Sequence, residues 1–222
     1  MGEVGQVIVY GLIAALSPVA LLATLAVLAT DRARANGTTF GIGFLLGQTL
    51  ALVVTLLLGS ITIGDRGDST VLASFELGAG VLLIAIGLRR RGREETQREL
   101  GGSRTSAFMA RLAGLTPRTA FTVGFPLGIG VKRLVVTVLA ASTIAIADVG
   151  HADAIKLGAA YVSVACALVL LPVAVYLIAG SRADEWVVDS KAWLTANQAR
   201  LTSMALLAFG ALFVADGIAA LA

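Results

Sequence analysis

The chain has 222 residues, of which 57% are hydrophobic and only 14% are charged, and its formal net charge is +3. Soluble domains usually have about 25% charged residues, so this composition excludes an ordinary soluble protein and indicates one embedded in lipid. The small basic excess does not indicate nucleic-acid binding, because nothing in the sequence resembles a folded recognition module.

Six apolar segments are long enough to cross a bilayer, which takes roughly 20 helical residues. They cover residues 4–30, 37–63, 69–88, 119–147, 154–180 and 201–222. The first segment is longer than the apolar region of a cleaved signal peptide, which has about 7–15 residues, and no basic residue precedes it. We therefore predict an all-α, polytopic membrane protein with six transmembrane helices in a single domain, residues 1–222.

The basic residues indicate how these helices are oriented. Most of the 17 Lys and Arg residues fall in the connections after the first, third and fifth segments, and they include the cluster from Arg89 to Arg93. Cytoplasmic connections carry such an excess. We therefore expect a multi-pass protein of the cell membrane with both termini outside and with the long connection, residues 89–118, in the cytoplasm. The basic cluster also suits contact with anionic membrane lipids.

A second long connection, residues 181–200, alternates charged and apolar residues and contains Trp186 and Trp193. Tryptophan is enriched at the membrane–water interface, where its ring is apolar and its N–H stays close to water. We expect this connection to form an amphipathic helix that lies at the interface.

The two halves of the chain resemble each other. Residues 11–21 align without a gap on residues 124–134, so that Ser17 falls on Gly130. Each half holds three apolar segments, an odd number, so the second half enters the membrane from the opposite face. The sequence thus predicts two inverted three-helix repeats, an architecture common in transporters. The repeats cover residues 4–88 and 119–222.

The first and fourth apolar segments contain helix-breaking residues near mid-membrane. Pro18 has no N–H and leaves a carbonyl one turn earlier without its helical partner. Pro126 lies among closely spaced glycines that end at Gly130. Unwound backbone at membrane depth is tolerated only where it is buried in protein or faces a water-filled cavity. At Ser17 and Pro18 a simple kink and an unwound segment remain equally open, whereas the pattern around Pro126 favours a cavity.

Lys132 and Arg133 are adjacent in the middle of the fourth segment, and residues 119–147 carry no other charge. Charges at this depth are costly, so they usually pair, face the interior of a bundle or line a path. We expect one cation to pair with Glu76 and the other to meet a substrate anion or a lipid headgroup; a purely structural ion pair is the alternative. Glu76 is the main candidate for proton coupling, and Asp216 is a weaker one. The predicted substrate pathway comprises Ser17, Pro18, Pro126, Gly130, Lys132 and Arg133.

Small residues spaced four apart favour close approach of membrane helices. They occur as three pairs: Gly37 with Gly41, Gly43 with Gly47, and Gly124 with Gly128. This spacing indicates tight packing, but it fits a contact within one chain and a contact in a homodimer equally well.

Other kinds of chemistry find little support in the sequence. His151, with Asp148 and Asp153 nearby, offers too few ligands for a metal site, and Cys166 has no second cysteine for a disulfide. The spans hold no paired carboxylates and no nucleophile with a histidine, so we expect no enzyme. The chain also has no phosphate-binding loop, so we expect no cofactor and an ion gradient or a partner as the energy source.

The order of residues resembles the LysE exporter superfamily, and most closely its GAP branch of peptidoglycolipid- and sulfolipid-addressing proteins of actinobacteria. The resemblance covers the whole chain and rests on short motifs: Ala15-Leu16-Ser17-Pro18, Asn36-Gly37 with Phe40, Gly43-Phe44, Gly47 and the Gly-Pro-Gly-Lys-Arg pattern of the fourth segment. The superfamily often has Ser-Pro-Gly-Pro and Asn-Pro-Lys, where this chain has Ser17-Pro18-Val19-Ala20 and Gly130-Val131-Lys132. These departures favour the divergent branch over an amino-acid exporter.

The resemblance implies export. We expect a transporter that moves an anionic cell-envelope glycolipid toward the outer surface, with membrane lipids as its surroundings. Two alternatives remain open. One is an exporter of a small solute such as an amino acid or an ion. The other is a non-transporting accessory factor of a lipid-export machinery, for which residues 89–118 would be the docking segment.

Overall fold

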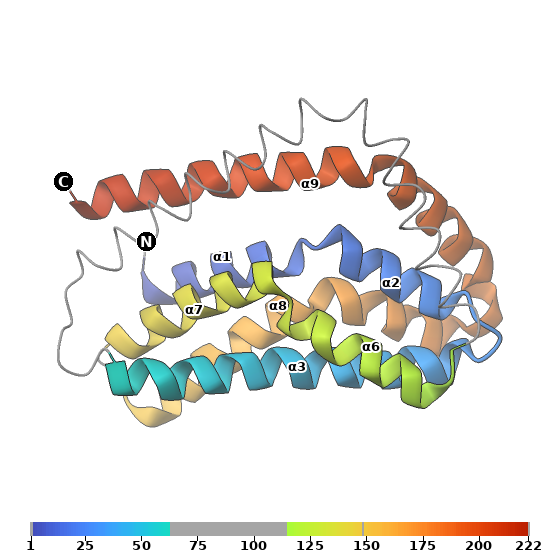
Figure 1. The fold of residues 1–222 in the computed structure, drawn as a ribbon, viewed down its shortest axis with the longest axis horizontal. Coiled ribbons are helices and arrows are strands. Elements are labelled where there is room, and N and C mark those ends of the chain that lie inside the picture. The colour runs from blue at the N-terminus through green and yellow to red at the C-terminus, as the bar shows by residue number, and fades with distance from the viewer. Residues whose placement is uncertain (1, 63–114, 148, 222) are drawn as a thin grey trace.

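The structure is a computed structural model that describes residues 2–62, 115–147 and 149–221. All regular structure in these residues is helical, and Figure 1 shows most of the helices running side by side in one bundle. The helices are α1 (Glu3–Ala15), α2 (Pro18–Leu28), α3 (Ala33–Thr62), α6 (Pro117–Ile129), α7 (Val131–Ile146), α8 (His151–Ala179), a short 3-10 turn η1 (Gly180–Ala183) and α9 (Asp184–Leu221).

Two helices are long and apolar enough to cross a membrane without a break, Ala33–Leu57 within α3 and His151–Ala179. Two further spans are bent pairs: α1 with α2, at 57°, and α6 with α7, at 55°. The described residues therefore hold between two and four candidate spans. The apolar segment at residues 69–88, with Glu76, lies outside the described residues. Residues 201–221, the expected sixth span, belong to α9 and are not among these candidates, so six spans are not confirmed.

Local chemistry explains where the bent helices begin and end. Pro18 occupies the first turn of α2, where its missing N–H costs no hydrogen bond. Thr116 caps α6, because its hydroxyl accepts from the backbone N–H of Thr119, whose own hydroxyl accepts from the backbone of Thr116. Gly130 separates α6 from α7 with an extended ψ of 137°. Each bend thus falls on a residue that the sequence marks as a helix breaker.

The described helices bury two apolar clusters. The larger one joins α1, α3, α7 and α8 around Tyr10, Phe40, Leu139 and Tyr161, each at most 1% exposed. The smaller one joins α2, the end of α8 and the first turns of α9. Tertiary packing, more than helix propensity, therefore fixes how these helices are placed.

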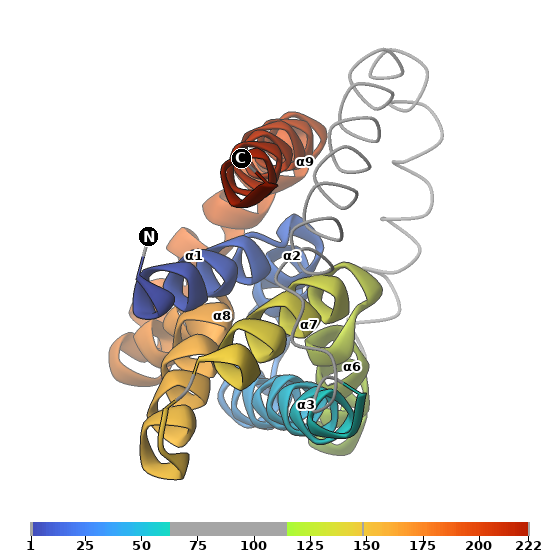
Figure 2. The same ribbon diagram turned by 90° about the vertical axis from the view of Figure 1, so that its left-hand side faces the viewer.

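Glycine brings α3 and α6 into unusually close contact. A Cβ added at Gly43 would lie 2.6 Å from the carbonyl oxygen of Phe121, and the nearest atom to a Cβ at Gly47, Gly124 or Gly128 is likewise a backbone oxygen of the opposite helix. Figures 1 and 2 both show α6 lying against α3. These two glycine pairs therefore contribute to packing within one chain.

The last part of the chain differs from the expected division into an interfacial helix and a separate span. Asp184–Leu221 form one continuous helix, α9, because residues 184–209 contain neither proline nor glycine. Its first turns are amphipathic, with Val187 and Leu194 buried and Val188 exposed. In Figure 1, α9 curves across one end of the bundle and then runs along it, and both chain termini lie at the opposite end.

Candidate functional site

The two helix breaks face each other in the core of the bundle. α1 ends at Ala15, Leu16 caps it, and Ser17 is the extended residue that precedes α2. Because Pro18 has no N–H, the carbonyl of Ala14 has no helical partner four residues later. That carbonyl and the carbonyl of Leu16 both accept hydrogen bonds from the first turn of α7.

Arg133 makes the largest set of contacts at this place, and it is only 3% exposed. Its Nη1 donates to the carbonyl of Ala14 at 2.7 Å, its Nη2 to the carbonyl of Ala165 at 2.7 Å, and its Nε to Oε1 of Gln48 at 2.9 Å. The guanidinium also lies 4.5 Å from the ring centre of Phe44, a cation–π contact. One side chain of α7 thus connects α1, α3 and α8.

A second layer of hydrogen bonds holds these partners in place. Gln48 Nε2 donates to the hydroxyl of Thr137 at 3.0 Å, and that hydroxyl donates to the carbonyl of Arg133 at 2.8 Å. The hydroxyl of Tyr161 lies 2.8 Å from the same oxygen. All four side chains are buried. A network whose members are all satisfied fixes a unique arrangement, and here it fixes the direction of the guanidinium.

Lys132 has different surroundings, although it is the preceding residue. Its side chain is partly exposed, and its Nζ donates to the carbonyl of Leu16 at 3.0 Å. The two cations together therefore contact the last carbonyls of α1, the end of a helix at which positive charge is stabilising. Arg133 is enclosed by the bundle, whereas Lys132 is partly exposed.

The structure thus brings together most of the residues that the sequence singles out for a pathway, namely Ser17, Pro18, Gly130, Lys132 and Arg133. Pro126 lies one turn before Gly130, with an exposed ring and a carbonyl that accepts from the N–H of Gly130 at 3.0 Å. Glu76 lies outside the described residues, and so does the side chain of Asp216, whose backbone belongs to α9. The expected pairing of a cation with Glu76 therefore stays a prediction.

Sequence reasoning did not find Gln48, Thr137 and Tyr161. Each is a polar residue within an apolar segment, and Thr137 also aligns with Thr24 in the internal repeat, but neither signal indicates a role at this site. The partners at Ala14 and Ala165 are backbone carbonyls, which no residue type reveals.

The remaining residues considered in the sequence analysis, His151, Asp153 and Cys166, form no metal site in the described structure. Within the part of the chain that the structure describes, no group of three or more His, Cys, Asp or Glu residues could hold a metal ion. His151 is the first residue of α8, and Asp153 forms an exposed ion pair with Lys156 at 2.8 Å. Cys166 is buried.

Comparison with known protein families gives one informative result. The model of a family described as Sap, sulfolipid-1-addressing protein, matches residues 7–219. Neither the comparison with curated proteins nor the comparison with solved structures gave a match. The matched residues include both helix breaks, the contacts of Arg133 and nearly all of α9, and the description of the family is consistent with a lipid-related role in a membrane.

Proposed function

Because the chain belongs to the sulfolipid-1-addressing protein family, we propose that it is a membrane transporter of the LysE type that moves an anionic cell-envelope glycolipid toward the outer surface. The main observation behind this proposal is that the break between α1 and α2 lies against the start of α7, where Lys132 and Arg133 donate hydrogen bonds to the carbonyls of Leu16 and Ala14. Broken helices at a repeat interface are where secondary transporters bind their substrates. The proposal assigns the chain no enzymatic reaction.

The two cations have separate roles in this proposal. Arg133 positions the helices, since its three hydrogen bonds go to α1, α3 and α8. Lys132 contacts the substrate, because it is the partly exposed cation and its Nζ can exchange the carbonyl of Leu16 for an anionic headgroup. The acyl chains of the lipid would remain in the bilayer while the headgroup passes the break.

The proposal includes two inverted repeats, and three observations support them. The gapless alignment places Ser17 on Gly130, and these residues precede α2 and α7. The bends at the two breaks are 57° and 55°. Continued without a gap beyond residue 21, the alignment places Thr24 on Thr137, and each buried hydroxyl donates to the carbonyl four residues earlier at 2.8 Å.

We place the protein in the cell membrane with both termini outside. One end of the bundle in Figure 1 contains the last residues of α2 and α8 and the first residues of α3, α6 and α9. Four exposed arginines belong to that end: Arg32, Arg34, Arg118 and Arg182. The positive-inside rule assigns that end to the cytoplasm. Uphill movement would need an ion gradient, and Glu76 is the residue we assign to proton coupling, since a carboxylate within the membrane can titrate.

The test is a flipping assay in liposomes with a fluorescently labelled sulfated glycolipid as the probe and a membrane-impermeant reductant as the readout. We expect Lys132→Ala to reduce the rate at least about tenfold, equivalent to about 1.4 kcal/mol. Lys132→Arg should keep most of the rate, because the positive charge remains. The matched control is Lys156→Ala, which removes an exposed cation far along the chain from either break.

The other outcomes of this assay decide between the alternatives. Equal rates for the wild type and Lys132→Ala would contradict the role of Lys132. Movement of labelled amino acids but not of the glycolipid would favour a small-solute exporter. No movement of either probe by a folded wild type would favour an accessory factor, and the next step would be a deletion within residues 89–118. Glu76→Gln should abolish dependence on a pH gradient if Glu76 couples protons.

A further inference from the structure

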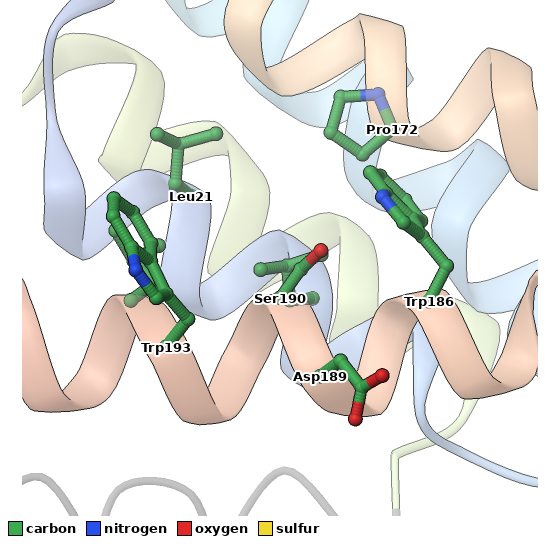
Figure 3. Close-up of a pocket in the computed structure, with 8 residues that line it drawn as sticks. Leu21, Pro172, Trp186, Asp189, Ser190 and Trp193 are labelled. Carbon is green, nitrogen blue, oxygen red and sulfur yellow. The ribbon is translucent and has the colours of Figure 1, made fainter.

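A hollow of about 410 Å³ lies between α2, α8 and the first turns of α9. Figure 3 shows Trp186 beside Pro172 and Trp193 beside Leu21, with Ser190 between the two indoles. Its lining includes none of Ala14, Phe44, Gln48 and Ala165, the described partners of the Arg133 guanidinium. The hollow is lined by Leu21, Leu25, Pro172, Trp186, Asp189, Ser190, Trp193 and Leu194.

The lining is almost entirely carbon. The two tryptophan side chains remain 44% and 60% exposed although they border the hollow, so protein does not cover them fully. In Figure 3 the carboxylate of Asp189 lies on the side of α9 away from Leu21 and Pro172. An apolar space on the outside of the bundle, with partly exposed indoles at its rim, suits hydrocarbon better than water or a polar solute.

The position of the hollow along the bundle suits the first part of an acyl chain. Pro172 lies seven residues before Ala179, the end of α8, and Leu21 lies seven residues before Leu28, the end of α2. At 1.5 Å per residue, both lie about 10 Å below the basic end of the bundle. The hollow therefore begins near the headgroup region and extends into the hydrocarbon.

Positive charge lies where the headgroup of such a lipid would be. Arg34 and Arg182 are exposed, and the Arg34 guanidinium lies against Gly180, which ends α8 with a φ of +60°. Asp184, two residues after Arg182, accepts a hydrogen bond from the hydroxyl of Tyr176 at 2.8 Å. Basic side chains at the cytoplasmic face of a membrane protein attract anionic lipids.

We propose that this hollow is a binding groove for one acyl chain of an anionic membrane lipid, whose headgroup lies beside Arg34 and Arg182. The first turns of α9 hold the lipid against α2 and α8. This site is separate from the helix breaks, and it stands whether or not the protein transports a glycolipid.

The only two tryptophans of the chain border this groove, so their fluorescence reports on it directly. The experiment reconstitutes the full chain in phosphatidylcholine vesicles that contain increasing fractions of phosphatidylglycerol brominated on the acyl chains. Bromine quenches a tryptophan only at close range. We expect saturable quenching, with half of the effect reached at a several-fold lower fraction of brominated phosphatidylglycerol than of brominated phosphatidylcholine. Unlabelled phosphatidylglycerol should reverse it.

Variants locate the quenching. Trp186→Phe and Trp193→Phe leave one indole each, and both single-tryptophan proteins should show the saturable component. Ser190→Phe fills the groove from α9 and should abolish that component, whereas Val188→Phe, on the exposed side of the same helix, should keep it. The double variant Arg34→Gln, Arg182→Gln should be quenched equally by brominated phosphatidylglycerol and brominated phosphatidylcholine.

Three results would overturn the proposal. Quenching that rises linearly with every brominated lipid would show ordinary contact with the bilayer. Equal loss of saturable quenching in Ser190→Phe and Val188→Phe would place the effect outside the groove. Indoles that no brominated lipid quenches would show that protein, such as another segment of this chain, fills the space. Flipping of the glycolipid probe, measured in the same vesicles, tests the transport proposal independently.

Discussion

Lys132 and Arg133 occupy different surroundings because one step along a helix rotates a side chain by about 100°. That rotation directs the guanidinium toward α1, α3 and α8 and leaves the ammonium partly exposed. The planar guanidinium offers five N–H donors in a fixed arrangement, which suits three partners on three helices. An ammonium cannot reproduce that geometry, so we regard the two positions as not interchangeable.

The first prediction concerns the stability that Arg133 provides. Arg133→Met leaves the carbonyl of Ala14 and the amide oxygen of Gln48 without a donor, and it removes the hydrogen bond that the guanidinium gives to the carbonyl of Ala165 in the middle of α8. Each such loss inside a bundle is unfavourable. We expect the free energy of unfolding to fall by about 2–4 kcal/mol, because hydrogen bonds to charged groups are worth about 1.5–3 kcal/mol each and their losses do not simply add. Thermal unfolding in detergent micelles measures the change.

The matched control is Lys132→Met, which removes the neighbouring, partly exposed cation and its hydrogen bond to the carbonyl of Leu16 but leaves the buried contacts of Arg133 in place. We expect it to lower the unfolding temperature much less than Arg133→Met does. Equal losses in the two variants would contradict the separation of a positioning residue from a substrate-binding one.

Much of this site was predictable at the level of single residues. A charge within an apolar segment is rare, and proline and glycine act locally, so the sequence identified Ser17, Pro18, Gly130 and the two cations. Gln48 and Tyr161 were missed because their role depends on how α3 and α8 are rotated about their axes. The rotation of a helix about its axis is set by tertiary packing and cannot be predicted from the local sequence.

At the scale of helices, the bend between α1 and α2 depends on Pro18. The second prediction is that Pro18→Ala supplies an N–H that competes with Arg133 for the carbonyl of Ala14 and straightens the pair. The measurement uses spin labels on two exposed sites, Val4→Cys and Ala29→Cys, in a Cys166→Ala background. We expect the distance between the two labels to increase by several ångström. Flipping of the glycolipid probe should fall in the same variant, while the yield of folded protein stays close to that of the wild type.

An unchanged label distance in Pro18→Ala would mean that packing around Arg133, rather than the missing N–H, holds the bend. In that case Pro18→Ala combined with Arg133→Met should straighten the pair. Neither variant changing the distance would exclude both causes.

The contact between α3 and α6 gives the third prediction. Gly47→Ala would place a methyl group against the carbonyl of Phe125, a backbone atom that cannot move aside. Overpacking of this kind typically costs about 1–3 kcal/mol, and we expect a loss of stability in that range, measured by thermal unfolding in detergent. Gly41→Ala is the control in the same helix, because its methyl would meet only the end of the Leu170 side chain, at 3.2 Å. Similar losses in both variants would indicate a general cost of alanine in α3.

The sequence predicted the places of the helix breaks better than the extent of the helices. α3 begins at Ala33, four residues before the expected start, because Ala33 to Asn36 include good helix formers that hydropathy alone does not count. The expected boundary near residue 200 does not exist in α9, because polar residues on one face do not end a helix. The bend angles depend on the packing of several helices and have no local signature.

At the scale of the whole molecule, the described charges are distributed unevenly between the two ends of the bundle. The fourth prediction is that Glu3→Cys, in a Cys166→Ala background, reacts with a membrane-impermeant maleimide on intact cells. Arg182→Cys should react only after the membrane is permeabilised, because we assign the basic end to the cytoplasm. Both side chains are exposed, so a lack of reaction would reflect the membrane and not burial. The reverse pattern would invert the assigned orientation.

The glycine contact between α3 and α6 also bears on the order in which the protein is made. A helix that contains Gly124, Pro126 and Gly128 is a weak candidate for insertion into a membrane by itself. During translation α3 leaves the ribosome well before α6, so the surface that accepts α6 already exists when α6 emerges. A circularly permuted chain that begins with the second half would reverse this order. Its α6 would then be synthesised before α3, the helix against which it packs.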